Sequence, residues 1–259
     1  MQALKKQESV DILFLTEAGG RDMNPVLVRN IRLGDGTPKI CVPIAEKKIE
    51  DIVKQAKLII DSPADMVEWR ADWFEDVFDF DKTREVLKAL REILGEIPIL
   101  FTIRTIVEGG EIKVDAETYV ELNKKAIDTM LVDLIDVEVL HFDADAKEII
   151  NYAHKKAVKV IASHHDFEKT PEEEILIMKL QTMEEFDADV MKVAVMPKVP
   201  EDVELLLAIA KDRAYPFVAI AMSKLGIKSR LQGAITFGTV GKASAPGQIS
   251  VYELKKMLV

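Results

Sequence analysis

Eight short apolar segments, each followed by a stretch with helical periodicity, are the feature that most constrains the fold of this chain. The segments are rich in β-branched residues and bounded by polar or Gly/Pro positions, which is typical of buried strands. Between them, apolar residues recur at spacings of three and four, as in Val86, Leu87, Leu90 and Leu94, and this predicts amphipathic helices. The predicted strands are 39–44, 66–72, 97–104, 134–139, 159–166, 190–197, 216–222 and 234–240.

This alternation predicts an α/β fold, a (β/α)₈ TIM barrel. Strands joined by helical connectors pair in parallel through right-handed crossovers, and eight such units close into a barrel. The competing fold is a doubly wound open sheet, which usually carries a glycine-rich turn after its first strand. Here the first strand ends at Val42-Pro43-Ile44 and is followed by Ala-Glu-Lys-Lys, which favours the barrel. The seventh connector is short.

The segment before the first unit predicts an N-terminal β-hairpin that closes the bottom of the barrel. Residues 26–33 alternate as a strand does and lead into a turn at Gly34-Asp35-Gly36. Residues 1–24 form an extension to which the sequence assigns no role, although 12–15 is a further strand candidate. We expect residues 25–259 to form a single barrel domain.

Composition excludes several classes of protein. Hydrophobic residues make up 48% of the 259 positions, enough for a large core, and the net charge of −10 disfavours binding to nucleic acid or anionic membranes. The single cysteine, Cys41, excludes an internal disulfide and lies in an apolar run typical of core. The sequence contains no apolar window long enough for a membrane span and no signal peptide, so we expect a cytoplasmic protein.

Polar residues recur at alternate positions near the ends of the predicted strands. Parallel strands buried on both faces usually read as near-continuous Val, Ile and Leu, and barrel enzymes carry their functional residues at the carboxyl ends of the strands. A buried salt-bridge network is the alternative, but one of this breadth would be costly unless it served a ligand. The polar positions are Glu68, Arg70, Asp72, Thr102, Arg104, Asp136, Glu138, Ser163, His165, Lys192 and Thr236.

Lys192 and His165 are the strongest candidates for chemistry. Lys192 stands in a strand that is otherwise apolar on both faces, where burial would favour the neutral amine that attacks a carbonyl. The alternative is a structural pair with Glu138 or Glu68. His165 shares the inner face with Ser163 and is suited to moving protons near neutral pH. The adjacent His164 should face the helices, and this pair is poorly placed to chelate, so we expect no metal.

Arginines and two glycine-containing loops complete the candidate site. Arg70, Arg104 and Arg230 suggest recognition of an anion such as a carboxylate. Glu108-Gly109-Gly110 predicts a carboxylate on a flexible loop after the third strand. The loop at 242–248 follows the eighth strand and could act as a lid, with Ser244 and Gln248 available for hydroxyl or carboxylate groups.

Eight motifs occur in order, from EWRADWF (68–74), TIRTIVEGGE (102–111) and DLIDVEV (133–139) through SHHDFEKTP (163–171) and KVAVMP (192–197) to SRL (229–231), TFG (236–238) and KASAPGQIS (242–250). With these motifs the chain resembles type I 3-dehydroquinate dehydratase, the Schiff-base-forming enzyme of the shikimate pathway. The resemblance runs from about Val26 to Leu258. It implies a (β/α)₈ barrel, usually homodimeric, that dehydrates 3-dehydroquinate to 3-dehydroshikimate without metal or organic cofactor.

The resemblance also assigns roles to individual residues. Lys192 matches the lysine that forms an imine with the ketone of the substrate, His165 matches the general acid/base, and Glu108 matches the carboxylate that orients this histidine. The positions that match substrate-binding residues are Glu68, Arg70, Arg104, Arg230, Ser244 and Gln248, with Arg230 on the carboxylate.

One departure from the family pattern bears on Arg230. The run from Ser229 to Gly238 is shorter than the usual segment between SRL and TFG, and this connector helps to place Arg230. Two other functions stay open on the sequence. A Schiff-base class I aldolase would also use a lysine on the sixth strand. A catalytically weakened barrel would only bind a carboxylated metabolite.

Overall fold

The computed structural model describes residues 24–211, 213, 215–241 and 249–259. Four features of the sequence lie outside these residues, namely the strand candidate at 12–15, the loop at 242–248, and Ser244 and Gln248 within that loop. Within the described residues, no helix combines the length and the apolar character that crossing a membrane would require.

Eight parallel strands form the barrel, as the sequence predicts. In the sheet they follow the order β10-β3-β4-β5-β6-β7-β8-β9, and the short β11 (Ile249–Ser250) pairs with the outer side of β10. A backbone hydrogen bond of 2.8 Å from Ala234 N to Phe217 O links the two ends of this order. The strands are β3 (Lys39–Ile44), β4 (Met66–Arg70), β5 (Ile99–Thr102), β6 (Leu134–Glu138), β7 (Lys159–Asp166), β8 (Val190–Val195), β9 (Phe217–Ala221) and β10 (Ile235–Thr239).

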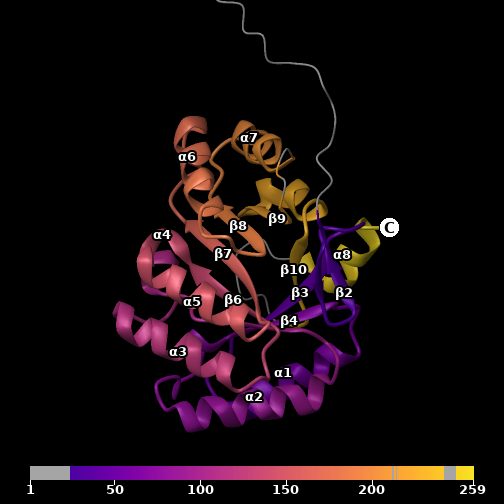
Figure 1. Cartoon of the computed structure of the whole chain (residues 1–259). Coiled ribbons are helices and arrows are strands. Elements are labelled where there is room, and N and C mark those ends of the chain that lie inside the picture. Colours follow the sequence, from indigo (N-terminus) through magenta and orange to yellow (C-terminus); the bar gives the residue numbers. More distant parts are fainter. Residues whose placement is uncertain (1–23, 212, 214, 242–248) are drawn as a thin grey trace, which may run out of the picture.

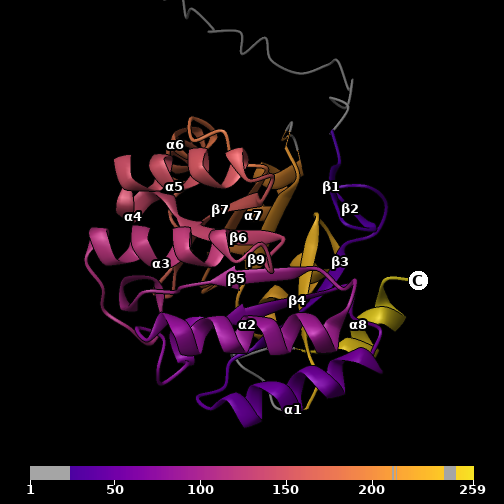
Figure 2. The same cartoon turned by 60° about the horizontal axis from the view of Figure 1, so that its bottom comes forward.

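Helices cover the outer face of the curled sheet in both views (Figures 1 and 2). In α2, Asp79 caps the N-terminus by accepting from Lys82 N, and the buried residues recur at the spacing expected of an amphipathic helix. The α-helices are α1 (Ile49–Ile60), α2 (Phe80–Leu94), α3 (Ala116–Asp128), α4 (Val139–Phe142), α5 (Ala144–Lys155), α6 (Glu173–Glu184), α7 (Pro200–Lys211) and α8 (Val251–Met257). The 3₁₀ segments are η1 (Ala71–Trp73), η2 (Ile106–Glu108) and η3 (Lys224–Leu231).

The lower interior of the barrel is an apolar layer to which every strand contributes. Two residues of the N-terminal segment, Val28 and Leu33, pack against this layer and so close the bottom of the barrel. Because side chains alternate along a strand, the next inward position on each strand lies two residues further on and belongs to the layer above. The lower layer contains Cys41, Met66, Leu100, Leu134, Ile161, Val190, Val218 and Ile235.

The bottom closure is a hairpin, but its turn is not where the sequence predicts it. Strands β1 (Val26–Val28) and β2 (Ile31–Leu33) pair antiparallel within the segment expected to be one strand. The turn is at Arg29-Asn30, where Arg29 has a left-handed φ of 48°. Gly34 and Gly36 instead follow the second strand. The alternating pattern hid the turn because a two-residue turn keeps the apolar residues of both strands on one side.

The connector between β9 and β10 is η3, a 3₁₀ segment of eight residues. This confirms the prediction of a short seventh connector. Gly226 in this segment approaches the end of β9 so closely that an added Cβ would lie 1.6 Å from Ala221 O. The close approach holds the connector against the barrel rim, and Arg230 lies near its end.

Three aspartates join neighbouring strands at the bottom of the barrel by the same arrangement. Asp65, Asp133 and Asp189 each directly precede a strand, β4, β6 and β8 in turn. Their carboxylates accept a backbone N–H of the strand before, from Ile40 at 2.7 Å, Ile99 at 2.8 Å and Val160 at 2.9 Å. Asp133 also receives Arg91 and, from the hairpin, Arg29.

We predict that Asp133→Ala lowers the free energy of unfolding by about 1–3 kcal/mol. The substitution leaves the backbone N–H of Ile99 and the guanidinium groups of Arg29 and Arg91 without this acceptor. The matched control is Glu96→Ala, which removes the other carboxylate bound to Arg29. Glu96 is 82% exposed and Asp133 only 12%, so the control should cost less than about 0.5 kcal/mol. Urea unfolding of both variants measures the difference, and equal losses would contradict the assigned role.

Candidate active site

A polar layer lies directly above the apolar layer inside the barrel. Its members stand two residues beyond apolar ones on the same strands, as Lys192 follows Val190 and Asp136 follows Leu134. Above them, at the carboxyl ends of the strands, lies a cavity of about 130 Å³. The side chains that line it are Glu68, Arg70, Arg104, Glu108, His165, Phe167, Lys192, Met196, Ile220, Met222, Arg230 and Phe237, together with Gly109 and Ala194.

Lys192 is buried inside the barrel and paired with a carboxylate. Its Nζ lies 3.1 Å from Asp136 Oδ2 and 3.7 Å from Glu68 Oε1, and it sits 4.7 Å from the centre of the Phe237 ring. The pairing with Glu68 matches the structural alternative considered from the sequence, but Glu138 is not a partner, and the closest carboxylate is Asp136. Burial opposes ionisation of Asp136, but the charges of Arg104 and Lys192 outweigh it and hold the pKa of this carboxyl well below its usual range.

Arg104 holds three buried carboxylates together. Its Nη2 donates to Asp136 Oδ1 at 2.6 Å, and its Nη1 lies 3.1 Å from Glu138 Oε1 and 3.2 Å from Glu108 Oε2. Nη1 also donates to Ser163 Oγ at 3.0 Å. Burial opposes the charge of Arg104, yet the three carboxylates raise its pKa well above the ordinary value. Both terminal nitrogens of Arg104 therefore donate to side chains of the protein.

Glu138 is fixed by the start of η2 and is fully buried. Thr105 donates to it twice, from its backbone N at 2.8 Å and from Oγ1 at 2.7 Å. Burial raises the pKa of Glu138 despite these donors and Arg104. Since both of its oxygens are engaged by protein groups, Glu138 ties η2 to strand β6.

Glu108 is rigidly buried, which corrects the prediction of a flexible loop. It ends the 3₁₀ segment η2 and is 3% exposed. The two glycines after it are tightly packed: a Cβ at Gly109 would lie 2.3 Å from the Phe167 ring, and one at Gly110 would lie 1.9 Å from Arg104 O. Gly109 has a left-handed φ of 78°. The glycines are therefore required for close packing of the segment that carries Glu108.

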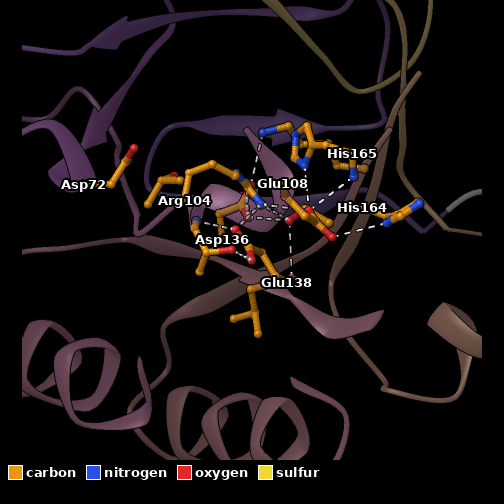
Figure 3. Close-up of polar contacts among 12 residues, drawn as sticks. Asp72, Arg104, Glu108, Asp136, Glu138, His164 and His165 are labelled. Atoms are coloured by element: carbon orange, nitrogen blue, oxygen red, sulfur yellow. Dashed lines mark hydrogen bonds and ion pairs between the residues drawn. The ribbon is translucent and has the colours of Figure 1, made fainter. Parts of the chain in front are cut away.

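Glu108 and His165 form a hydrogen-bonded pair at the edge of the cavity. His165 Nδ1 lies 2.9 Å from Glu108 Oε2, and the backbone N of His165 donates to the same oxygen at 3.1 Å. Figure 3 shows Glu108 between Arg104 and the two histidines. The sequence-based expectation that Glu108 lies beside His165 is thus met by the geometry.

The protonation states of this pair follow from burial and charge. Burial opposes ionisation of Glu108, but hydrogen bonds from His164 and His165 and the charge of Arg104 lower its pKa to about 2. Burial and the charges of Arg104 and Lys192 lower the pKa of His165 to about 3, although Glu108 acts in the opposite direction. At neutral pH the pair is a carboxylate beside a neutral imidazole, which is able to accept a proton.

His164 lies on the opposite side of the strand from the cavity, as its position next to His165 predicts. Its Nε2 lies 2.9 Å from Lys179 Nζ of α6. Its second contact could not be predicted from the sequence: Nδ1 lies 3.2 Å from Glu108 Oε1. Both histidines therefore reach the same carboxylate.

All three predicted anion-binding arginines line the cavity, and the surroundings of Arg70 and Arg230 differ from those of Arg104. Arg70 is held by Asp72, which accepts from Nε and Nη2 at 2.8 Å each. Arg230 is buried and donates from Nη1 to Phe237 O at 3.2 Å, while its Nε has no partner among the described residues. Burial lowers the pKa of Arg230. The short connector before β10 thus still brings a guanidinium to the cavity.

In the described part of the chain, neither Cys41 nor the acidic residues form a second reactive or metal-binding site. Cys41 is fully buried in the lower layer, where burial raises the pKa of its thiol well above the ordinary value, so it is core as expected. Among the described residues no group of three or more His, Cys, Asp or Glu side chains is arranged to hold a metal ion.

Three residues that shape the site were not identified as site residues from the sequence: Asp72, Thr105 and Lys179. Asp72 did appear among the alternating polar positions, and its partner Arg70 is two residues away. Thr105 and Lys179 carry no sequence signal, because their contacts with Glu138 and His164 depend on how η2 and α6 pack against the barrel.

Sequences and structures similar to this chain are known. Residues 40–259 match the family described as type I 3-dehydroquinase. The 3-dehydroquinate dehydratase of Clostridioides difficile (strain 630) is 46% identical over 243 residues, which are 90% of this chain and 95% of that protein. The 3-dehydroquinate dehydratase of Listeria innocua is 44% identical over 245 residues, 91% of this chain and 97% of that protein. A crystal structure of type I 3-dehydroquinate dehydratase from Clostridium difficile with covalently modified comenic acid superimposes with a TM-score of 0.87 at 45% identity, covering 91% and 96% of the two chains.

The low pKa of His165 predicts how stability depends on pH. The unfolded chain takes up a proton on this imidazole near pH 6.5, whereas the folded protein does so only near pH 3. The stabilisation is complete above pH 6.5 and declines as pH falls toward 3, by about 1.4 kcal/mol per pH unit. Between pH 7.5 and pH 5.0, His165→Gln should therefore lose about 2 kcal/mol less stability than the wild type.

Urea unfolding at the two pH values measures this difference. The control is His141→Gln at an exposed position, which should keep the wild-type response. If His165→Gln loses as much stability as the wild type, the imidazole is not buried in its neutral form.

Proposed function

This chain belongs to the type I 3-dehydroquinase family and is a hydro-lyase of the shikimate pathway that dehydrates 3-dehydroquinate to 3-dehydroshikimate, and we propose that it does so through an imine on Lys192. The observation that carries this mechanism is a buried lysine and a neutral histidine lining one cavity. A lysine amine attacks a ketone to give an imine, and a histidine moves the protons of the later steps. Family membership favours dehydration over aldol cleavage.

Lys192 is suited to nucleophilic attack by its surroundings. The carboxylates of Asp136 and Glu68 pair with its Nζ, and the centre of the Phe237 ring lies 4.7 Å from the same nitrogen. The carboxylates fix the position of the nitrogen. Apolar residues of the cavity, among them Ile220 and Met222, limit the access of water to the imine.

His165 is the proposed general acid/base. Its Nδ1 is committed to Glu108 Oε2, which leaves Nε2 as the nitrogen that exchanges protons with the substrate. Glu108 orients the ring and stabilises the imidazolium that forms when Nε2 takes a proton. The pKa of about 3 in the free enzyme ensures that this nitrogen is unprotonated at the start of the reaction.

The steps balance with these two residues alone. The ammonium of Lys192 releases one proton, and its Nζ bonds to the ketone carbon. The carbonyl oxygen takes up that proton and a second one from Nζ and leaves as water, giving a protonated imine. His165 Nε2 removes a proton from the adjacent carbon, and the electron pair of that C–H bond moves into the imine to give an enamine. The enamine then expels the β-hydroxyl, which takes a proton from His165 and leaves as water. A further water hydrolyses the imine, releasing the product and restoring the amine.

The arginines at the cavity would bind the carboxylate of the substrate. Arg230 is the better placed, because its guanidinium is buried and its Nε has no partner within the described part of the chain. Arg70, held rigid by Asp72, is a second cation on the cavity wall. Glu68 would accept a substrate hydroxyl. Arg104 lines the cavity, but its contacts support a role mainly in holding Asp136, Glu138 and Glu108.

Further parts of the proposal rest on the family resemblance. We propose that residues 25–259 act as one catalytic domain, that the protein is a cytoplasmic homodimer, and that no metal or organic cofactor takes part. Ser244 and Gln248 keep their predicted role in binding the substrate, although both lie outside the described residues.

We predict that Lys192→Ala lowers kcat for 3-dehydroquinate by at least about 10³-fold, because no other group can form the imine at that position. The absorbance of the conjugated enone follows the reaction directly. Lys198→Ala, just beyond the end of β8 and exposed, is the matched control and should retain the wild-type rate. Comparable loss in both variants, or a Lys192→Ala variant that keeps its rate, would refute the role of Lys192.

A further inference from the structure

His164 connects the buried carboxylate of the site to a helix outside the barrel. It lies on β7 beside His165, and its side chain points to the other side of the strand. One ring nitrogen, Nδ1, lies 3.2 Å from Glu108 Oε1, and the other, Nε2, lies 2.9 Å from Lys179 Nζ on α6. Figure 3 shows Glu108 in contact with both histidines. Neither His164 nor Lys179 lines the cavity.

The partners of His164 determine which of its nitrogens carries the hydrogen. A lysine ammonium has three donors and no acceptor, so Nε2 must accept from Lys179. In a neutral imidazole the hydrogen is then on Nδ1, which donates to Glu108 Oε1. The ionised carboxylate only accepts, so His165 likewise donates from Nδ1, to Oε2. A directed chain of hydrogen bonds thus leads from Lys179 through His164 to Glu108, and a second donor reaches Glu108 from His165.

We propose that Lys179 is a positioning residue for the reaction: by binding Nε2 of His164, it holds the ring where Nδ1 donates to Glu108, and so keeps Glu108 in the orientation that leaves Nδ1 of His165 protonated and Nε2 open to the substrate. This inference rests on the proposed function of His165 as the acid/base. It gives His164 a role beyond packing, although neither residue touches the substrate.

The distribution of donors around Glu108 shows why this link matters. Oε2 receives three groups, namely Arg104 Nη1, the backbone N of His165 and His165 Nδ1. Among the described residues, His164 is the one donor to Oε1. A His164 ring that left this position would leave Oε1, a buried carboxylate oxygen, without a donor. The carboxylate would then rotate or share the donors of Oε2, and His165 would lose its fixed orientation.

Removing the charge of Lys179 has a defined effect on the pH profile. Among the described residues, the other charged groups that face Glu108 and His165 are Arg104 near the end of β5, Asp136 and Glu138 on β6, and Lys192 on β8. None of these changes in a Lys179 variant. With one cation fewer near this pair, the charge repulsion that disfavours the imidazolium of His165 is weaker. The acid limb of kcat/KM should therefore move to higher pH, by up to about one unit.

The test compares Lys179→Met with Lys179→Arg, which keeps a donor, and with Lys155→Met, the same change at an exposed position on α5. Long-range ¹H–¹⁵N spectra of histidine-labelled protein report the tautomer of His164. We expect the Nδ1–H form alone in the wild type, Lys179→Arg and Lys155→Met, and a mixture of the two tautomers in Lys179→Met, where the ring is no longer held against Glu108. In Lys179→Met, kcat should fall by about 10-fold with KM within about twofold.

The spectroscopic and kinetic results separate this inference from the proposed function. An unchanged His164 tautomer in Lys179→Met, or a kcat and acid limb equal to those of Lys155→Met, would overturn the role of Lys179. A wild-type protein that shows no turnover of 3-dehydroquinate would overturn the proposed function instead, because the tautomer is measured without substrate.

Discussion

The ion-pair network centred on Arg104 is the interaction on which the rest of the site depends. One guanidinium binds carboxylates from two separate elements, Asp136 and Glu138 on β6 and Glu108 at the end of η2. Buried carboxylates of this kind are costly unless they are paired and hydrogen-bonded. Each of the three also accepts from other donors, such as Thr105 for Glu138 and Ser163 for Asp136. The network therefore fixes η2 against the barrel, and with it the carboxylate that orients His165.

Along the strands of the barrel, the residues that form the apolar core lie below the residues that line the cavity. The lower layer is apolar on all eight strands and is closed by the hairpin, so it supplies the hydrophobic core of the barrel interior. Two residues further along, the same strands supply Glu68, Asp136 and Lys192 to the layer beneath the cavity. The polar layer stands on a close-packed apolar base, which holds Glu68, Asp136 and Lys192 in fixed positions.

Much of this arrangement was predictable because the strand period of two assigns each residue to a face. It located all eight strands, placed Ser163 and His165 on the inner face, and identified Lys192 as an ionisable residue that is buried away from solvent. The same pattern could not place the turn at Arg29-Asn30, because both hairpin strands keep the alternation. Nor could it show that Glu108 is buried or that Lys179 reaches His164, since these contacts depend on how η2 and α6 pack.

The central claim is that Lys192 forms an imine with 3-dehydroquinate, and reductive trapping tests it most directly. Borohydride delivers hydride to the imine carbon and converts the transient bond into a stable secondary amine. We expect the protein treated with 3-dehydroquinate and borohydride to lose activity and to carry the substrate-derived mass on the peptide that contains Lys192. Full turnover with no adduct after borohydride, or an adduct on a different lysine, would contradict the mechanism.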